Sequence, residues 1–175
     1  MKLYNKTSIP DAILSALLIK AGRSVGAATS NVVVDVGRGL NMWSSGEAHE
    51  CCATWRNGRY VDTDGGWFKI ILPLGGTTRP DYDPLEVAQS FLRVARHEWG
   101  HIRDFQHGGR RVMEFARAGR SGRRAAHDSR PEEIRANDYV WDSDQRLSIS
   151  HFDDVLLALA LAIEEAAAGT NRGAK

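Results

Sequence analysis

The stretch from Asp83 to His107 constrains the fold most, because it predicts one long helix of about seven turns. Asp83 is a favoured N-cap residue, and Pro84 suits the first helical position, where its missing N–H costs nothing. Gly108 and Gly109 are expected to end the helix. Apolar residues recur between these signals at the spacing of one helix face, namely Leu85, Val87, Ala88, Phe91, Leu92, Val94 and Ala95. The rest of the chain must pack against that face.

The second half of this helix carries the motif His97-Glu98-Trp99-Gly100-His101. At about 100° per residue, His101 lies only about 40° around the helix from His97, so both imidazoles can reach one metal ion. Glu98 falls beside the pair, displaced toward an open coordination position. Zinc with three protein ligands keeps a site for water and lowers the pKa of that water to about 7, and a neighbouring carboxylate can then take its proton. The motif HExxH therefore predicts a zinc peptidase with Glu98 as general base.

Such a site needs a third ligand, and the nearer candidate is His107, which completes the spacing HExxHxxDxxH. This spacing resembles the metzincin pattern HExxHxxGxxH, in which the glycine lets the chain turn and return the third histidine to the metal. Asp104 stands at the glycine position, and aspartate adopts the left-handed conformation far less freely. If the helix instead continues to Gly108, His107 lies three turns from His97 and out of reach. It is then a histidine facing the C-terminal dipole of the helix.

The second candidate lies between Ser129 and Val140, where Pro131 predicts the first turn of a new helix. Glu133 and Asn137 are four residues apart and share one face of that helix. The segment resembles that of gluzincins, the thermolysin-like branch of the zincin metallopeptidases, in which a glutamate in an ExxxD segment is the third ligand. The resemblance implies Glu133 on zinc and Asn137 behind His97, where its amide oxygen accepts from Nδ1–H without the charge of aspartate.

Other interpretations of this segment stay open. Glu133 can be a carboxylate at the helix start, paired with Arg130 or Arg135, and Glu132 is the neighbour to consider if the register is shifted. The segment also resembles the glutamate-bearing helix of membrane-associated CAAX-processing peptidases, of ImmA-like phage peptidases and of SprT-like proteins. These resemblances imply a small zinc peptidase domain of phage or prophage origin.

The flanking segments predict an α+β fold of zincin type. We expect an N-terminal helix, a small mixed and mostly antiparallel sheet, the HExxH helix and C-terminal helices. The first helix is expected from Pro10 or Asp11 to about Ala21, and the last after Ser150. Strand signals occur at Asn31–Val36, Gly46–Thr54, Gly58–Asp62 and Trp67–Leu72. In zincins the edge strand before the active helix binds substrate by strand addition, and Trp67–Leu72 is placed to resemble it.

With 175 residues, 42% of them hydrophobic, the chain predicts one domain over residues 1–168 and a flexible tail over 169–175. The formal net charge of +1 predicts no overall attraction to nucleic acid or to an anionic membrane. Residues 109–130, expected to form a loop between the ligand helices, hold seven arginines against two acidic residues. The stretch Arg110–Arg130 is predicted to be a solvated lid, or alternatively a nucleic-acid contact as in SprT-like proteases.

The remaining signals concern compartment and oxyanion binding. Cys51 and Cys52 are adjacent and cannot join distant segments, which indicates reduced thiols. No apolar stretch is long enough to span a membrane, and the N-terminus lacks a signal-peptide cleavage site, so a cytoplasmic protein is expected. Hydrolysis also needs a donor to the tetrahedral oxyanion. Tyr139 is the candidate that we single out, and the others are His127, His151 and Tyr82.

Taken together, the residues predict a peptidase that cleaves proteins or peptides with one catalytic zinc ion on His97, His101 and Glu133. Glu98 favours this function, since metal binding alone does not require a carboxylate between the two histidines. Two alternatives remain. One is a non-catalytic, zinc-stabilised interaction module from a phage or prophage, and the other is a nucleic-acid-associated protease that uses the arginine-rich stretch.

Overall fold

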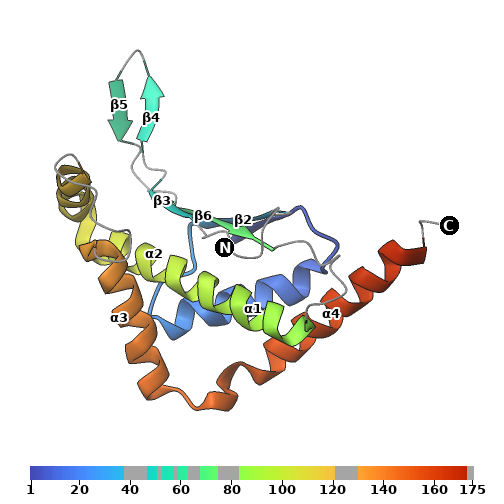
Figure 1. Ribbon diagram of the computed structural model, residues 1–175. Coiled ribbons are helices and arrows are strands. Elements are labelled where there is room, and N and C mark those ends of the chain that lie inside the picture. Colours follow the sequence, from blue (N-terminus) through green and yellow to red (C-terminus); the bar gives the residue numbers. More distant parts are fainter. Residues whose placement is uncertain are drawn as a thin grey trace.

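The computed structural model describes residues 1–37, 47–50, 53–56, 59–62, 68–74, 83–120 and 130–172. Within these ranges the protein is mostly helical, with four α-helices and a four-stranded sheet (Figure 1). The α+β class predicted from the sequence is therefore confirmed. Helices α1, α2 and α4 lie on the same side of the sheet. Across the described ranges, no helix combines the length and apolar character needed to cross a lipid bilayer.

The chain begins with a βαβ unit. Strand β1 (Lys2–Asn5) leads into helix α1 (Asp11–Ser24), which returns the chain to strand β2 (Val32–Gly37), parallel to β1. Side chains of β2 alternate between buried and half-buried, as expected for a strand with one face on the core. Sequence periodicity predicts no strand before α1, because four residues are too few to show a period. The pairing with β2 is what defines β1.

The sheet has the strand order β1-β2-β6-β3. Strand β6 (Phe68–Pro73) runs parallel to β2, and only β3 (Glu47–Glu50) is antiparallel to its neighbour. The sheet is mixed, but the expectation of mostly antiparallel strands is wrong, because the helical crossover through α1 imposes a parallel pair. Strands β4 (Ala53–Arg56) and β5 (Arg59–Asp62) form a separate antiparallel ribbon.

The prediction that Trp67–Leu72 forms an edge strand is also wrong. Strand β6 lies between β2 and β3, so β3 is the edge strand on this side. Ile70 and Leu72 of β6 are fully buried, which is what an interior strand under a layer of helices requires. The apolar run in β6 therefore marks a central strand.

Helix α2 (Pro84–Arg120) forms the centre of the molecule. Its predicted N-cap is confirmed, since Asp83 Oδ1 accepts a hydrogen bond from the Leu85 backbone N–H at 2.9 Å. The predicted end at Gly108 and Gly109 is wrong, because the helix runs on to Arg120. A glycine costs a helix interior only about 1 kcal/mol and does not by itself stop it. Residues 109–120 are therefore helical rather than part of a loop, and 121–129 lie outside the described residues.

The chain closes with α3 (Pro131–Arg146), the 3₁₀ helix η2 (Ile149–Phe152) and α4 (Asp153–Arg172). Residues 169–172 belong to α4, so the predicted flexible tail cannot begin at 169, and residues 173–175 lie outside the described ranges. The glycine at 169 is tolerated for the same reason as those in α2. The last helix, expected after Ser150, packs on the core together with η2 through the buried residues Phe152, Val155, Leu159, Ala160 and Ile163.

One contiguous core joins α1, β2, β6, α2 and α4. Trp99, from the HExxH motif, is its largest fully buried side chain. It packs closely on α1, because a Cβ added at Gly22 would lie 3.0 Å from Trp99 Cδ2. The middle of the motif thus anchors α2 in the core, which fixes the direction of the neighbouring histidines.

Arg96 precedes the motif and joins α2 to three other elements. Its side chain is buried, its Nη2 lies 2.7 Å from Asp144 Oδ1 and donates to Ser143 Oγ at 2.8 Å, and its Nε donates to Ser24 Oγ at 3.3 Å. The guanidinium also lies over the Phe152 ring, 5.0 Å from its centroid. A single cation therefore connects α2 to α1, α3 and η2.

Replacing Arg96 with methionine is expected to lower the free energy of unfolding by about 2–3 kcal/mol, because charge-assisted hydrogen bonds are lost and the fully buried Ser143 hydroxyl loses its donor. Urea denaturation followed by circular dichroism measures the change. The exposed Arg93 on the same helix provides the control, since Arg93→Met should stay within about 0.5 kcal/mol of the wild type. Equal destabilisation by both substitutions would contradict the connecting role of Arg96.

Candidate metal centre

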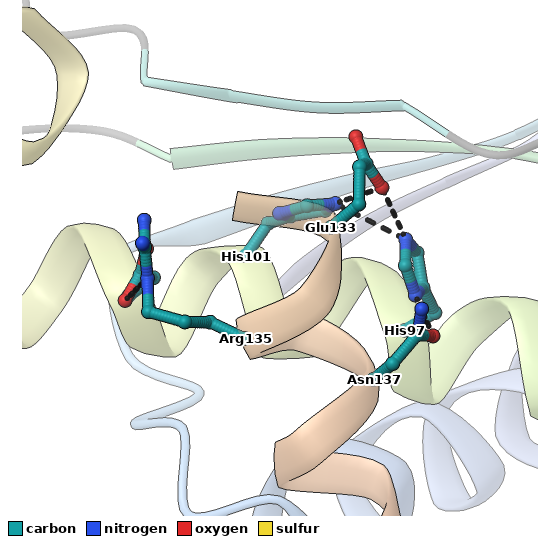
Figure 2. A network of polar contacts seen from close by, with 6 residues as sticks. His97, His101, Glu133, Arg135 and Asn137 are labelled. Atoms are coloured by element: carbon teal, nitrogen blue, oxygen red, sulfur yellow. Dashed lines mark hydrogen bonds and ion pairs between the residues drawn. The ribbon is translucent and has the colours of Figure 1, made fainter. Parts of the chain in front are cut away.

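Two helices bring three candidate ligand side chains together (Figure 2). His97 and His101 project from α2, and Glu133 projects from the first turn of α3. Glu133 Oε2 lies 2.9 Å from His97 Nε2 and 3.3 Å from His101 Nε2, and the two Nε2 atoms are 3.1 Å apart. In the described part of the chain, this is the one group of three or more His, Cys, Asp or Glu side chains that could hold a metal ion.

The spacings fit a tetrahedral metal. Ligand atoms about 2.0–2.1 Å from zinc in a tetrahedron are about 3.3 Å from one another. The three observed separations, 2.9, 3.1 and 3.3 Å, are within a few tenths of an ångström of that value. Two histidines and one glutamate also form one of the known ligand sets of catalytic zinc sites, which keep a fourth position open. The residues present therefore suit zinc in both chemistry and spacing.

Asn137 holds the first histidine in one orientation. Its Oδ1 lies 3.0 Å from His97 Nδ1, one turn along α3 from Glu133. In the tautomer in which Nδ1–H donates to this amide oxygen, the neutral ring has no proton on Nε2, and this nitrogen can bind a metal ion. This contact is the one that the gluzincin resemblance implies for Asn137.

The electrostatics of the cluster favour a bound cation. Burial lowers the pKa of His101, the neighbouring His97 imidazole lowers it further, and the Glu133 carboxylate acts in the opposite direction. A lowered pKa keeps the imidazole neutral at neutral pH, as a metal ligand must be. The Glu133 carboxylate oxygen faces both Nε2 atoms, and a cation placed among the three atoms would be attracted by this carboxylate.

Close contact between the helices lets Glu133 reach the histidines. At Gly100 a side chain is absent, and an added Cβ would lie 3.0 Å from both the Cα and the O atom of Ala136. Ala136 itself is fully buried. Sequence reasoning missed this pair, although a glycine inside a helix is a signal of close backbone approach. Gly100 and Ala136 together set the distance between α2 and α3.

An ion pair between the buried Asp104 and the half-buried Arg135 joins the same helices one turn beyond His101. Arg135 Nε donates to Asp104 Oδ1 and Oδ2 at 3.0 and 2.8 Å, and its Nη2 donates to Oδ2 at 2.7 Å. The hydrogen bonds to Asp104 raise the pKa of Arg135. Tyr139 donates its hydroxyl proton to Asp104 Oδ1 at 3.2 Å, and burial, with the Asp104 carboxylate, raises the pKa of Tyr139. The hydroxyl of Tyr139, the residue singled out as oxyanion donor, is therefore hydrogen-bonded to Asp104 in this structure.

The other predicted residues fall at different places. His107 is exposed and lies ten residues beyond His97 on the same helix, about 15 Å along its axis, so it is not part of the cluster. His151 lies on η2, where its ring packs edge-on against Phe152. Three further predictions concern residues that lie outside the described ranges, namely His127, Tyr82 and the Cys51–Cys52 pair.

The predicted general base belongs to the buried part of the motif. Glu98 follows His97 on α2 and is 4% exposed. Glu132, the neighbour considered for a shifted register, does not belong to the cluster of three. In the arginine-rich stretch, the backbone from 110 to 120 is helical, and Arg123 and Arg124 lie outside the described residues.

Comparison with known proteins gives no further assignment. No protein-family model matches the chain, and no curated protein or solved structure is significantly similar to it. The inference about function therefore depends on the residues of the site and their geometry.

Proposed function

We propose that the chain is a zinc-dependent peptidase of gluzincin type, with His97, His101 and Glu133 as ligands and Glu98 as general base. The observation that carries the proposal is the convergence of the two His Nε2 atoms and Glu133 Oε2 within 3.3 Å of one another. Asn137 behind His97 supports it, because ligating histidines usually donate their second N–H to an outer acceptor.

The reaction is hydrolysis of a peptide bond. When bound, zinc lowers the pKa of a water molecule to about 7 and polarises the substrate carbonyl. The Glu98 carboxylate accepts a proton from the attacking water and passes it to the nitrogen of the departing amine. Asn137 keeps the His97 ring in the tautomer whose Nε2 is free of a proton. The products are a carboxylic acid and an amine, with one water consumed.

Strand β3 is the proposed binding edge for the peptide. It ends the four-stranded sheet and lies against α2, the helix that carries His97 and His101. Its inner edge pairs with β6, and among the described strands none pairs with its outer edge. An extended peptide can add to such an edge through backbone hydrogen bonds, largely independently of side-chain identity.

Zinc content tests the proposal. After purification without added metal, the wild type is expected to hold about one zinc ion per chain. His97→Ala and Glu133→Gln should lose most of this zinc. Loss of a hydrogen bond to a ligand can lower metal affinity by up to roughly 100-fold, and loss of a ligand itself should lower the zinc affinity further. His107→Ala is the matched histidine control on the same helix and should keep its zinc. Elemental analysis and competition with a chelator give the two quantities.

The outcomes separate the alternatives. If His107→Ala lost its zinc while Glu133→Gln kept it, the third ligand would be His107 and the site would be metzincin-like. A wild-type protein that holds no zinc and cannot be loaded with it would overturn the proposal. Zinc binding without hydrolysis of any peptide would leave the non-catalytic interaction module as the function.

A further inference from the structure

Asp104 and Arg135 connect the two ligand-bearing helices close to the cluster. Asp104 lies three residues after His101 on α2, and Arg135 lies two residues after Glu133 on α3. Figure 2 shows Arg135 reaching α2 on one side of Glu133, while Asn137 reaches His97 on the other side. The carboxylate of Glu133 is therefore held between two points where α3 contacts α2.

The ion pair between these residues has a defined geometry. The guanidinium makes three hydrogen bonds to the carboxylate, at 2.7, 2.8 and 3.0 Å. Asp104 is 6% exposed, and its Oδ1 also accepts from Tyr139. Arg103 lies over the Tyr139 ring, 4.0 Å from its centroid. An arginine that uses two nitrogens fixes the orientation of its partner as well as its distance.

Metal binding demands such precision from α3. A shift of α3 by one residue's rise moves Glu133 by about 1.5 Å, whereas metal–ligand distances tolerate about 0.2 Å. Glu133 sits in the first turn of its helix, so the docking of α3 on α2 determines where its carboxylate lies. An ion pair with one partly exposed partner contributes little net stability, because solvent screens it and the desolvation of Asp104 offsets the gain in Coulomb energy. The ion pair between Asp104 and Arg135 instead fixes the position of α3 relative to α2.

We propose that Asp104 and Arg135 are positioning residues that fix α3 on α2 and thereby set the metal affinity of the His97, His101 and Glu133 site. This inference rests on the proposed function. Asp104 stands where the metzincin pattern has a turning glycine. In this chain the residue at that position binds the glutamate-bearing helix, and α2 continues past it.

The test compares zinc affinity with stability. The double variant Asp104→Asn/Arg135→Gln keeps a neutral polar pair and is expected to bind zinc roughly 10–100-fold more weakly than the wild type. The zinc affinity of Arg135→Lys should lie between those of the wild type and the double variant, since an ammonium group cannot reproduce the planar, two-nitrogen contact of a guanidinium. Affinity is measured by competition with a chromogenic chelator, and folding by circular dichroism of the metal-free proteins. The visible spectrum of bound Co²⁺ should change in the double variant, because the ligand geometry changes.

Asp144→Asn is the matched control. It removes the ion pair between Arg96 and Asp144, which joins the same two helices at the far end of α3. Its zinc affinity and Co²⁺ spectrum should equal those of the wild type. A folded double variant with the zinc affinity and the Co²⁺ spectrum of the wild type would overturn the positioning role and leave the proposed function intact. If the double variant does not fold, a wild-type zinc affinity in Arg135→Lys would overturn the positioning role. A wild type that binds no zinc removes both proposals.

Discussion

Replacing Glu98 with glutamine is expected to slow peptide-bond hydrolysis by about 10²–10⁴-fold, the usual contribution of a positioned general base. Glutamine has nearly the same shape as glutamate, so it fits the buried position, where Glu98 is 4% exposed. Its amide cannot accept a proton from water at neutral pH. The zinc content should stay at the wild-type level, because Glu98 is not one of the three proposed ligands.

The measurement incubates the zinc-loaded protein with two substrates, a fluorescently labelled unfolded protein and a peptide library of mixed sequence. Glu98→Asp serves as a second variant, since it keeps the carboxylate but withdraws it by one methylene, and partial activity is expected. The exposed His107→Ala should cleave at the wild-type rate. Full activity in Glu98→Gln, with zinc retained, would show that another group takes the proton.

Replacing Gly100 with alanine is expected to weaken both the fold and the metal site. The added methyl group would lie 3.0 Å from two backbone atoms of Ala136, so α3 itself must move. Overpacking costs about 1–3 kcal/mol, and the better helix propensity of alanine returns about 1 kcal/mol. A net loss of up to about 2 kcal/mol in unfolding free energy is expected. Zinc affinity should fall at least about tenfold, because Glu133 moves with α3.

Thermal unfolding and zinc competition together measure this effect. Gly169 provides the control, because it lies inside α4 and an added Cβ there would meet nothing within 4 Å. Gly169→Ala should leave zinc affinity unchanged and raise the unfolding free energy by up to about 1 kcal/mol. If Gly100→Ala bound zinc as tightly as the wild type, the close approach of α3 would not be needed for the site.

Local signals in the sequence predict the two helices that carry the candidate ligands well. The N-cap at Asp83 and the proline at 131 mark helix starts that the structure confirms. The four-residue spacing of His97 from His101, and of Glu133 from Asn137, places each pair on one helix face. Such relations depend only on helix geometry, which is why they can be derived without tertiary contacts.

Relations between distant segments could not be predicted in the same way. The direction of the strands follows from the crossover through α1 and from β1, which is too short to recognise. The ion pair between Asp104 and Arg135 joins residues 31 positions apart, and neither residue has a local pattern that indicates the other. The end predicted at Gly108 is wrong because a glycine costs a helix interior only about 1 kcal/mol, which does not by itself end the helix.

His97 and Glu133 are 36 positions apart in the chain, and they come from different helices. A zinc ion held by both would act as a cross-link that closes this loop. Like a disulfide, such a cross-link reduces the conformational entropy of the unfolded chain, with the difference that a chelator can open it. The concentration of free metal would then control how firmly α3 is attached, so loading the site and completing the fold would be one equilibrium.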